Sequence, residues 1–97
     1  MNVYDIGDVV RVSATFTNQV GAPVDPGGVT LKVKNPVGVK TSYVYVVDLA
    51  LIRDSPGNYH LDLEPAIQGV WTYRWEGTAP NKGAEEASFQ ISESAFD

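Results

Sequence analysis

Hydrophobic and polar residues alternate along most of this chain, and a period of two residues is typical of half-buried β-strands. The clearest stretch is 69–77, GVWTYRWEG, which places Trp71, Tyr73 and Trp75 on one face and polar residues on the other. These rings form either the centre of a hydrophobic core or an aromatic platform for a ligand. Because a small domain concentrates its core in a few large side chains, we expect a buried core strand.

Two tight turns divide the remaining alternating segments. The same period of two predicts further strands at 8–18, 29–34, 39–47 and 86–92. Asn-Pro-Val-Gly at 35–38 and Ser-Pro-Gly-Asn at 55–58 have Pro and Gly at positions that turns prefer, and the second turn predicts a hairpin. If Ser55 lies opposite Asn58, then Ile52 lies beside Leu61, unless a bulge shifts this register by one residue.

The fold class follows from the spacing of these elements. About seven short strands with turn residues between them and no helical periodicity predict an all-β fold, an antiparallel immunoglobulin-like β-sandwich. With 97 residues, 43% of them hydrophobic and 20% charged, the chain suits a single domain over 1–97 with short N- and C-terminal arms. We expect the aromatic strand to pack on Phe16, Leu31, Leu61 and Phe89.

The charge balance limits the partners. Seven Lys and Arg against twelve Asp and Glu give a net charge of -5, and the cations are scattered along the sequence. Since a phosphate backbone needs clustered cations, we expect no nucleic-acid partner, and no membrane partner either. The chain has no Cys and therefore no disulfide. Because no signal peptide or membrane-spanning stretch is found, we expect synthesis and retention in the cytosol unless another route of exit exists.

No motif in the chain indicates catalysis. His60 is the only histidine, and alternation places it on the outer face of its strand without a nucleophile motif nearby. His and Cys ligands for a metal are lacking, and the acidic residues at 5 and 8 and at 85 and 86 have the pattern of solvated charges. We therefore expect a protein that is not an enzyme, with no catalytic residues, no metal site and no cofactor.

Residues 41–51, TSYVYVVDLAL, are apolar on both faces, whereas a sandwich strand needs only one apolar face. Three explanations are open: a loop such as 20–24 covers the segment, the segment crosses between sheets, or another protein chain covers it. The terminal arms also carry apolar residues, which either contact a partner or fold back onto the sandwich. The candidate interface consists of Val3, Tyr4, Ile6, Tyr43, Tyr45, Val47, Leu49, Leu51 and Phe96.

Three stretches carry a family resemblance. YDIGDVV at 4–10, RDSPGNYH at 53–60 and GVWTYRWEG at 69–77 resemble small immunoglobulin-like proteins encoded among the structural genes of tailed bacteriophages and prophages. The resemblance covers nearly the whole chain. It implies a virion structural protein, such as a head decoration or a head or tail accessory protein, which acts by docking and display and has no catalytic residues. Its partners would be other virion proteins or further copies of itself, and its location the virion.

The same stretches also resemble bacterial immunoglobulin-like and carbohydrate-associated modules. The alternative function is therefore a carbohydrate- or cell-surface-binding module, in which Tyr43 and Tyr45 form an exposed aromatic platform. A sandwich with neither a signal peptide nor a disulfide favours the virion, because a virion component is made in the cytosol and leaves when the host lyses.

Overall fold

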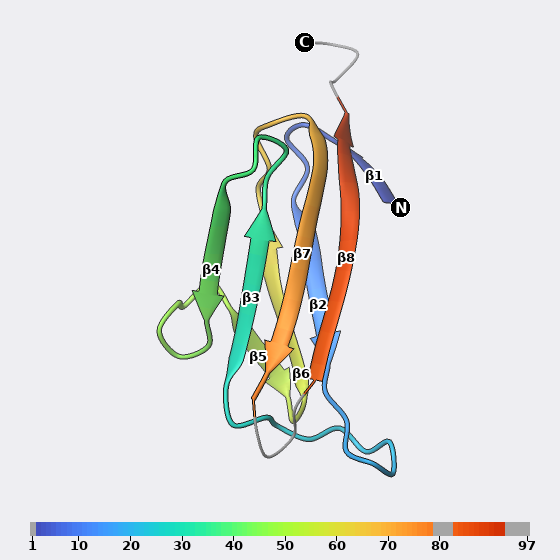
Figure 1. Cartoon of the computed structure of the whole chain (residues 1–97), viewed down its shortest axis with the longest axis vertical. Coiled ribbons are helices and arrows are strands. Elements are labelled where there is room, and N and C mark those ends of the chain that lie inside the picture. Colours follow the sequence, from blue (N-terminus) through green and yellow to red (C-terminus); the bar gives the residue numbers. More distant parts are fainter. Residues whose placement is uncertain (1, 79–82, 93–97) are drawn as a thin grey trace.

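The computed structural model describes residues 2–78 and 83–92, and these form eight β-strands joined by turns and loops (Figure 1). These residues contain no helix. The strands are β1 (Asn2–Asp5), β2 (Val10–Thr15), β3 (Val29–Lys34), β4 (Lys40–Val44), β5 (Ile52–Ser55), β6 (Asn58–Leu63), β7 (Gly69–Gly77) and β8 (Gly83–Ser92). The prediction of an all-β fold is confirmed.

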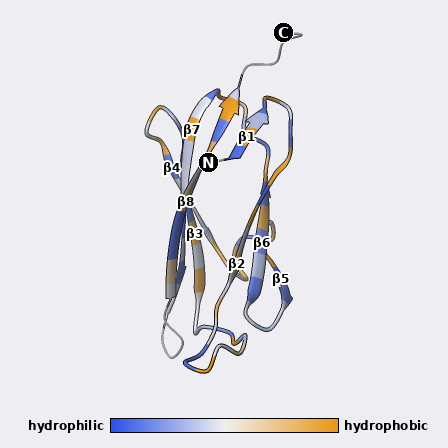
Figure 2. Cartoon of the chain, turned by 90° about the vertical axis from the view of Figure 1, so that its right-hand side faces the viewer, coloured by the Kyte–Doolittle hydropathy of each residue, from blue (hydrophilic) through white to orange (hydrophobic). Residues whose placement is uncertain are grey.

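The strands form two sheets that pack face to face, and Figure 2 shows the two layers edge-on. One sheet has five strands in the order β1-β8-β7-β3-β4, and the other has three in the order β2-β6-β5. This arrangement corresponds to an immunoglobulin-like sandwich. All pairs are antiparallel except β1 with β8, which run parallel. The predicted sandwich is therefore confirmed, with one strand more than the seven expected.

The core lies between the sheets and is built by the alternating residues of both. Trp75 is fully buried, and Phe16, Leu31, Leu61 and Phe89 join it in one continuous apolar cluster, as predicted. Trp71 and Tyr73 share its face of β7 but are only half-buried. The Trp71 ring stacks on Phe89 with 6.1 Å between ring centroids, and its Nε1 donates a hydrogen bond to the Ile67 carbonyl oxygen at 2.9 Å. The aromatic strand is therefore mainly a core strand.

The β5–β6 hairpin forms at the predicted turn but with a shifted register. Ser55 lies opposite Asn58, and a bulge then places Arg53 opposite Tyr59 and Ile52 opposite His60. Of the two predicted registers, the one that a bulge shifts by one residue is therefore correct, and Ile52 does not lie beside Leu61. The shift turns Ile52 outward and leaves the preceding residue, Leu51, buried with 3% of its surface exposed.

The N-terminal arm is a strand and not a free extension. Residues 2–5 form β1, which pairs with β8 so that Tyr4 lies opposite Ile91. The Tyr4 ring also contacts Phe89 edge to face, with 6.0 Å between ring centroids. For this arm, folding back onto the sandwich is the correct alternative. The C-terminal part of the prediction, Phe96, lies outside the described residues.

Candidate functional site

The doubly apolar segment 41–51 crosses from one sheet to the other. The strand predicted over 39–47 ends at Val44, and the chain then turns away towards β5 (Figure 1). Asp48 closes the turn, because its Oδ2 accepts a hydrogen bond from the Val44 N–H at 2.7 Å and its own N–H donates to the Val44 carbonyl at 2.8 Å. The loop at 20–24 bonds elsewhere, with the Val24 N–H donating to the Phe16 carbonyl. The second explanation, crossing between sheets, is therefore confirmed.

This crossing leaves three apolar side chains in solvent, and we call Val46, Val47 and Leu49 the apolar loop. Their exposed fractions are 74%, 77% and 86%. Val46 also has φ +81°, in the left-handed region that a β-branched residue rarely occupies. Such strain persists only where the surrounding structure enforces it, and it gathers at functional sites. Val46 is therefore held in an unfavourable backbone conformation, and the hydrophobic side chains of the apolar loop are exposed.

Other members of the predicted interface in this segment point inward. The Tyr45 ring packs edge to face on Tyr59 with 5.3 Å between ring centroids, and Tyr43 is half-buried beside the core. Leu51 is buried and is not accessible to a partner. The exposed platform expected from Tyr43 and Tyr45 is therefore absent, and of the predicted residues in this segment only Val47 and Leu49 are exposed.

The predicted interface residues of the N-terminal arm belong to a different surface. Val3 is 60% exposed, whereas Tyr4 and Ile6 are half-buried. They lie on and beside β1, which is one edge strand of the five-stranded sheet, and β4 is the opposite edge strand. The structure thus divides the predicted interface into two separate surfaces and does not bring them together.

A hydrogen-bonded cluster around Asp25 lies beside the crossing segment and includes three residues of the β5–β6 hairpin. The Asp25 carboxylate accepts two hydrogen bonds from the Arg53 guanidinium at 3.0 and 2.8 Å, one from the Gly57 N–H at 2.9 Å and one from the Tyr59 hydroxyl at 2.9 Å. The bonds from Arg53, then Gly57 and Tyr59, hold the pKa of Asp25 well below its usual range. Burial and then the bond to Asp25 raise the pKa of Tyr59 to about 12.

This cluster joins the β2–β3 loop to the β5–β6 hairpin, and its Tyr59 ring packs on Tyr45. Arg53, Gly57 and Tyr59 all belong to the stretch RDSPGNYH at 53–60, but no pattern in the sequence pairs that stretch with Asp25, which lies 28 residues before Arg53. Both side chains remain partly exposed, 41% for Asp25 and 34% for Arg53. The four hydrogen bonds hold the two loops in place, and the Asp25 carboxylate is the acceptor in each of them.

His60 lies on the outer face of β6, as predicted, and has an acidic partner that alternation does not reveal. Its Nδ1 is 2.7 Å from Asp54 Oδ2. Ser13 lies opposite His60 on β2, but no hydrogen bond joins Ser13 to His60 within residues 2–78 and 83–92. A nucleophile, a base and a carboxylate are therefore not assembled in this part of the chain.

Two other features are absent from residues 2–78 and 83–92. No group of three or more His, Asp or Glu side chains there is placed to hold a metal ion. Nor does that part of the chain contain a helix long and apolar enough to cross a membrane.

The outer face of the five-stranded sheet gathers cations that are distant in the sequence. Lys32 and Arg74 are paired with Glu76, at 2.8 and 2.9 Å, and Arg74 also reaches Glu86 at 3.3 Å. On the adjacent row of the sheet, Lys34 and Lys40 lie directly opposite one another. These four cations are scattered along the sequence, and the register of β3, β4 and β7 brings them together.

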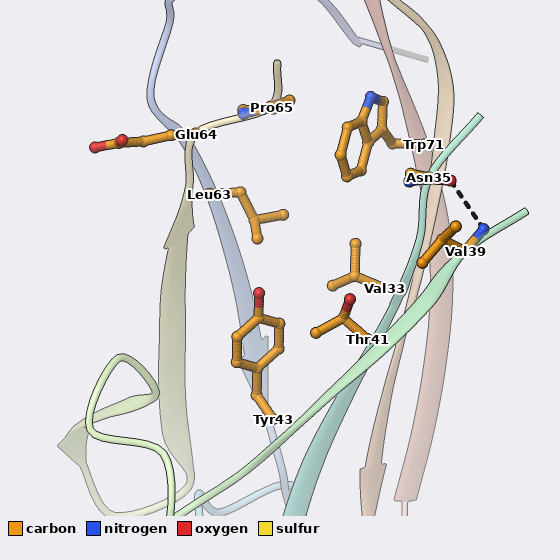
Figure 3. Close-up of a pocket in the computed structure, with 9 residues that line it drawn as sticks. All are labelled: Val33, Asn35, Val39, Thr41, Tyr43, Leu63, Glu64, Pro65 and Trp71. Atoms are coloured by element: carbon orange, nitrogen blue, oxygen red, sulfur yellow. Dashed lines mark hydrogen bonds between the residues drawn. The ribbon is translucent and has the colours of Figure 1, made fainter. Parts of the chain in front are cut away.

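A cleft of about 200 Å³ opens between the two sheets beneath β4 (Figure 3). Thr41 and Tyr43 of β4 line one side, and Leu63 at the end of β6 lines the other. Val33 and Trp71 also contribute. Figure 3 shows the side chains of Tyr43, Val33 and Leu63 pointing into the same space. Trp71 thus contributes both to the core and to the wall of an open cleft.

Comparison with known proteins adds no functional assignment. No protein-family model matches the sequence, and no curated protein matches it significantly.

Proposed function

We propose that this protein is a non-enzymatic docking domain that binds another protein through the apolar loop. More specifically, we propose a structural component of a bacteriophage virion, such as a head decoration or a head or tail accessory protein. The observation that carries the docking proposal is the exposure of Val46, Val47 and Leu49 together on one short crossing. Exposed apolar side chains that gather on one loop are typical of interaction sites.

Contacts hold the apolar loop at both ends, which favours binding. Asp48 bonds to both backbone groups of Val44 on one side, and buried Leu51 fixes the chain on the other. Because side-chain and loop ordering opposes association, a loop fixed at both ends loses less entropy when it binds. The positive φ of Val46 is consistent with a conformation maintained for contact and not for stability.

Neighbouring apolar residues extend the surface. Val44 and Ile52, at the two ends of the crossing, are 40% and 43% exposed. A stable interface buries about 800 Å² on each partner, and a few central residues supply most of its binding energy. We therefore assign the apolar loop the central position in a larger contact that includes the ends of β4 and β5.

The virion assignment is supported by the resemblance of 4–10, 53–60 and 69–77 to virion-associated immunoglobulin-like proteins. The physical character of the chain agrees with it. A sandwich without cysteine needs no oxidising compartment to fold, and virions assemble in the reducing cytosol. A virion coat offers many copies of one partner surface, to which a small preformed loop can dock repeatedly.

Two measurements test this proposal. Particles purified from the phage or prophage that encodes the chain should contain it by mass spectrometry. Purified protein should then rebind to particles that lack it, whereas Val47→Ser combined with Leu49→Ser should not. A matched control is Val20→Ser with Val37→Ser, because these residues are 87% and 71% exposed on other loops. Equal rebinding by both double variants, or particles without the chain, would contradict the proposal.

A further inference from the structure

β4 is an edge strand whose backbone is only partly used. In an antiparallel pair, alternate residues direct both backbone groups to the same neighbour. The Asn35 N–H donates to the Val39 carbonyl at 2.9 Å, and the Tyr45 N–H donates to the Val29 carbonyl at 3.0 Å. The odd-numbered residues of β4 therefore bond to β3, and the even-numbered ones face the open edge. Asp48 already bonds to Val44.

Lys40 and Ser42 are the remaining even-numbered residues of β4. No described residue bonds to their backbone groups on the open side. A free N–H and a free C=O at each position can pair with an incoming strand, which is how a sheet edge recruits an extended peptide. The free edge is short, and a ligand must therefore gain further contacts from its side chains.

The three-stranded sheet also has an open edge here, on the side of the sandwich where β4 lies. β5 pairs with β6 only as far as Ile52 opposite His60, so residues 61–63 have β2 as their only described neighbour strand. At the level of β5, the crossing itself closes the gap with buried Leu51 and half-buried Tyr45. Above that level no described strand stands between β4 and β6, and the cleft of about 200 Å³ lies there (Figure 3).

The two faces of an added strand would meet different surroundings. Side chains of a strand alternate between the faces of its sheet. Those on the inner face would enter the cleft beside Tyr43, Leu63 and Trp71, which Thr41 and Glu64 also line. Those on the outer face would lie beside Lys40 and within reach of Lys34, the next residue across the sheet.

Lys34 and Lys40 suit an acidic ligand. Like charges directly opposite one another destabilise a sheet, and no carboxylate among the described residues forms an ion pair with either side chain. The neighbouring cations Lys32 and Arg74 already have Glu76 and Glu86 as partners. An added carboxylate would therefore find its complement at Lys34 and Lys40.

We propose that this site, the β4 groove, binds an extended segment of a partner protein in which apolar and acidic side chains alternate. The segment adds a strand to β4 at Lys40 and Ser42, places its apolar side chains in the cleft and places its carboxylates beside Lys34 and Lys40. The β4 groove is a second binding surface, separate from the apolar loop, and it does not depend on the virion assignment.

A labelled peptide of alternating leucine and glutamate, blocked at both ends, is the probe, and its affinity is measured by fluorescence anisotropy at low salt. Lys40→Glu should weaken binding at least about tenfold, since it replaces attraction by repulsion. Ser42→Pro should weaken it by a similar factor, because it removes an edge N–H that the β3 ladder does not use. The loop variant Val47→Ser with Leu49→Ser should bind the peptide as tightly as wild type.

A second peptide, with lysine in place of each glutamate, completes the test. It should bind wild type at least about tenfold more weakly, and Lys40→Glu should recover part of its affinity. If Ser42→Pro does not fold, as judged by thermal melting, the charge exchange at position 40 still decides the result. The proposal is overturned if no peptide binds, or if affinity is the same for both peptides and both proteins. Concentration-dependent sedimentation that Lys40→Glu abolishes would instead assign the groove to a second copy of this chain.

Discussion

The two edges of the five-stranded sheet place similar hydrophobic residues in different surroundings. At the β8 end, β1 covers the edge strand, and the rings of Tyr4, Trp71 and Tyr73 all pack on Phe89. At the β4 end, the chain leaves the sheet and exposes Val46 and the rest of the apolar loop. Hydrophobic residues thus stabilise the fold at one end and remain available to another molecule at the other.

The difference arises from where the backbone goes and not from how apolar the segments are. Tyr45 and Val46 are adjacent, yet Tyr45 packs on Tyr59 while Val46 is 74% exposed. Asp48 determines this outcome, because its bonds to Val44 end β4 and turn the chain outward. Predictions that separate packing from docking therefore require one substitution at each end.

The largest effect is expected in the packed core, at the middle strand of the five-stranded sheet, β7. Trp75→Ala removes a fully buried ring and should destabilise the fold by about 3–5 kcal/mol, enough to unfold a domain of this size at room temperature. Val70→Ala on the same strand is the control, because its side chain is 46% exposed and the change should be within about 1 kcal/mol. Circular dichroism during urea unfolding measures both. Similar stability of the two variants would show that Trp75 is not a core residue.

The hairpin turn below the crossing should show the next largest effect. Gly57 has φ +78°, and an added Cβ would lie 2.5 Å from the Phe16 carbonyl oxygen, so Gly57→Ala should destabilise the fold by about 2–4 kcal/mol. Gly38→Ala separates the cost of the positive φ from the cost of the steric contact. Gly38 has φ +92° but nothing within 4 Å of an added Cβ, and the variant should lose only about 1 kcal/mol. Equal losses measured by thermal melting would attribute the effect to φ alone.

The Asp25 cluster should make the stability of the fold depend on pH at both extremes. Because the pKa of Asp25 is depressed in the folded state, its contribution is complete above the unfolded value near 4 and is lost as the pH falls below about 4. Tyr59 acts in the opposite range. Its folded pKa of about 12 exceeds the unfolded value near 10, so stability falls as the pH rises from about 10 to about 12.

Urea unfolding of Asp25→Asn as a function of pH tests this dependence. The variant should be less stable than wild type at pH 7, and the difference should shrink as the pH falls below about 4. Asp48→Asn is a useful comparison, since Asp48 caps the turn without an ion pair among the described residues. If the free energies of unfolding of Asp25→Asn and wild type differ by the same amount from pH 7 to pH 2, Asp25 is not the group whose protonation lowers stability.

A smaller effect of opposite sign is expected in the apolar loop. Val46→Gly relieves the positive φ at the cost of extra freedom in the unfolded chain, and the net result should be a gain of about 1 kcal/mol. Val47→Gly should instead be neutral or destabilising, because positive φ among the described non-glycine residues occurs only at Val46. Scanning calorimetry distinguishes the two. If Val46→Gly lowers the melting temperature as much as Val47→Gly does, the loop is not strained.

The sequence alone predicts the parts of the fold that local alternation determines. β3 has the predicted bounds, Val29–Lys34, because Val29, Leu31 and Val33 alternate with polar residues between clear turns. β1 is not predictable in this way, because its four residues become a strand only by pairing with β8, which is distant in the sequence. The hairpin bulge likewise moves Ile52 without any change in the local pattern.

The candidate sites depend even more on long-range placement. Val47 and Leu49 are found from the sequence because they make both faces of a segment apolar. Lys34 and Lys40 become neighbours only through the β3–β4 register, and Asp25 meets Arg53 only when the two loops pack. Sequence patterns thus locate hydrophobic residues that the core does not need. Charge clusters and free strand edges can be located only once the topology of the fold is known.

Equilibrium urea unfolding of Val47→Ser with Leu49→Ser, on the same preparation used for particle rebinding, tests the central claim most directly. If the apolar loop serves docking, the free energy of unfolding should stay within about 0.5 kcal/mol of wild type, because both side chains are already in solvent. Rebinding to particles should fall at least about tenfold. A loss of more than about 1 kcal/mol with rebinding intact would show that these residues stabilise the fold, and would contradict the assignment of the β4 end to docking.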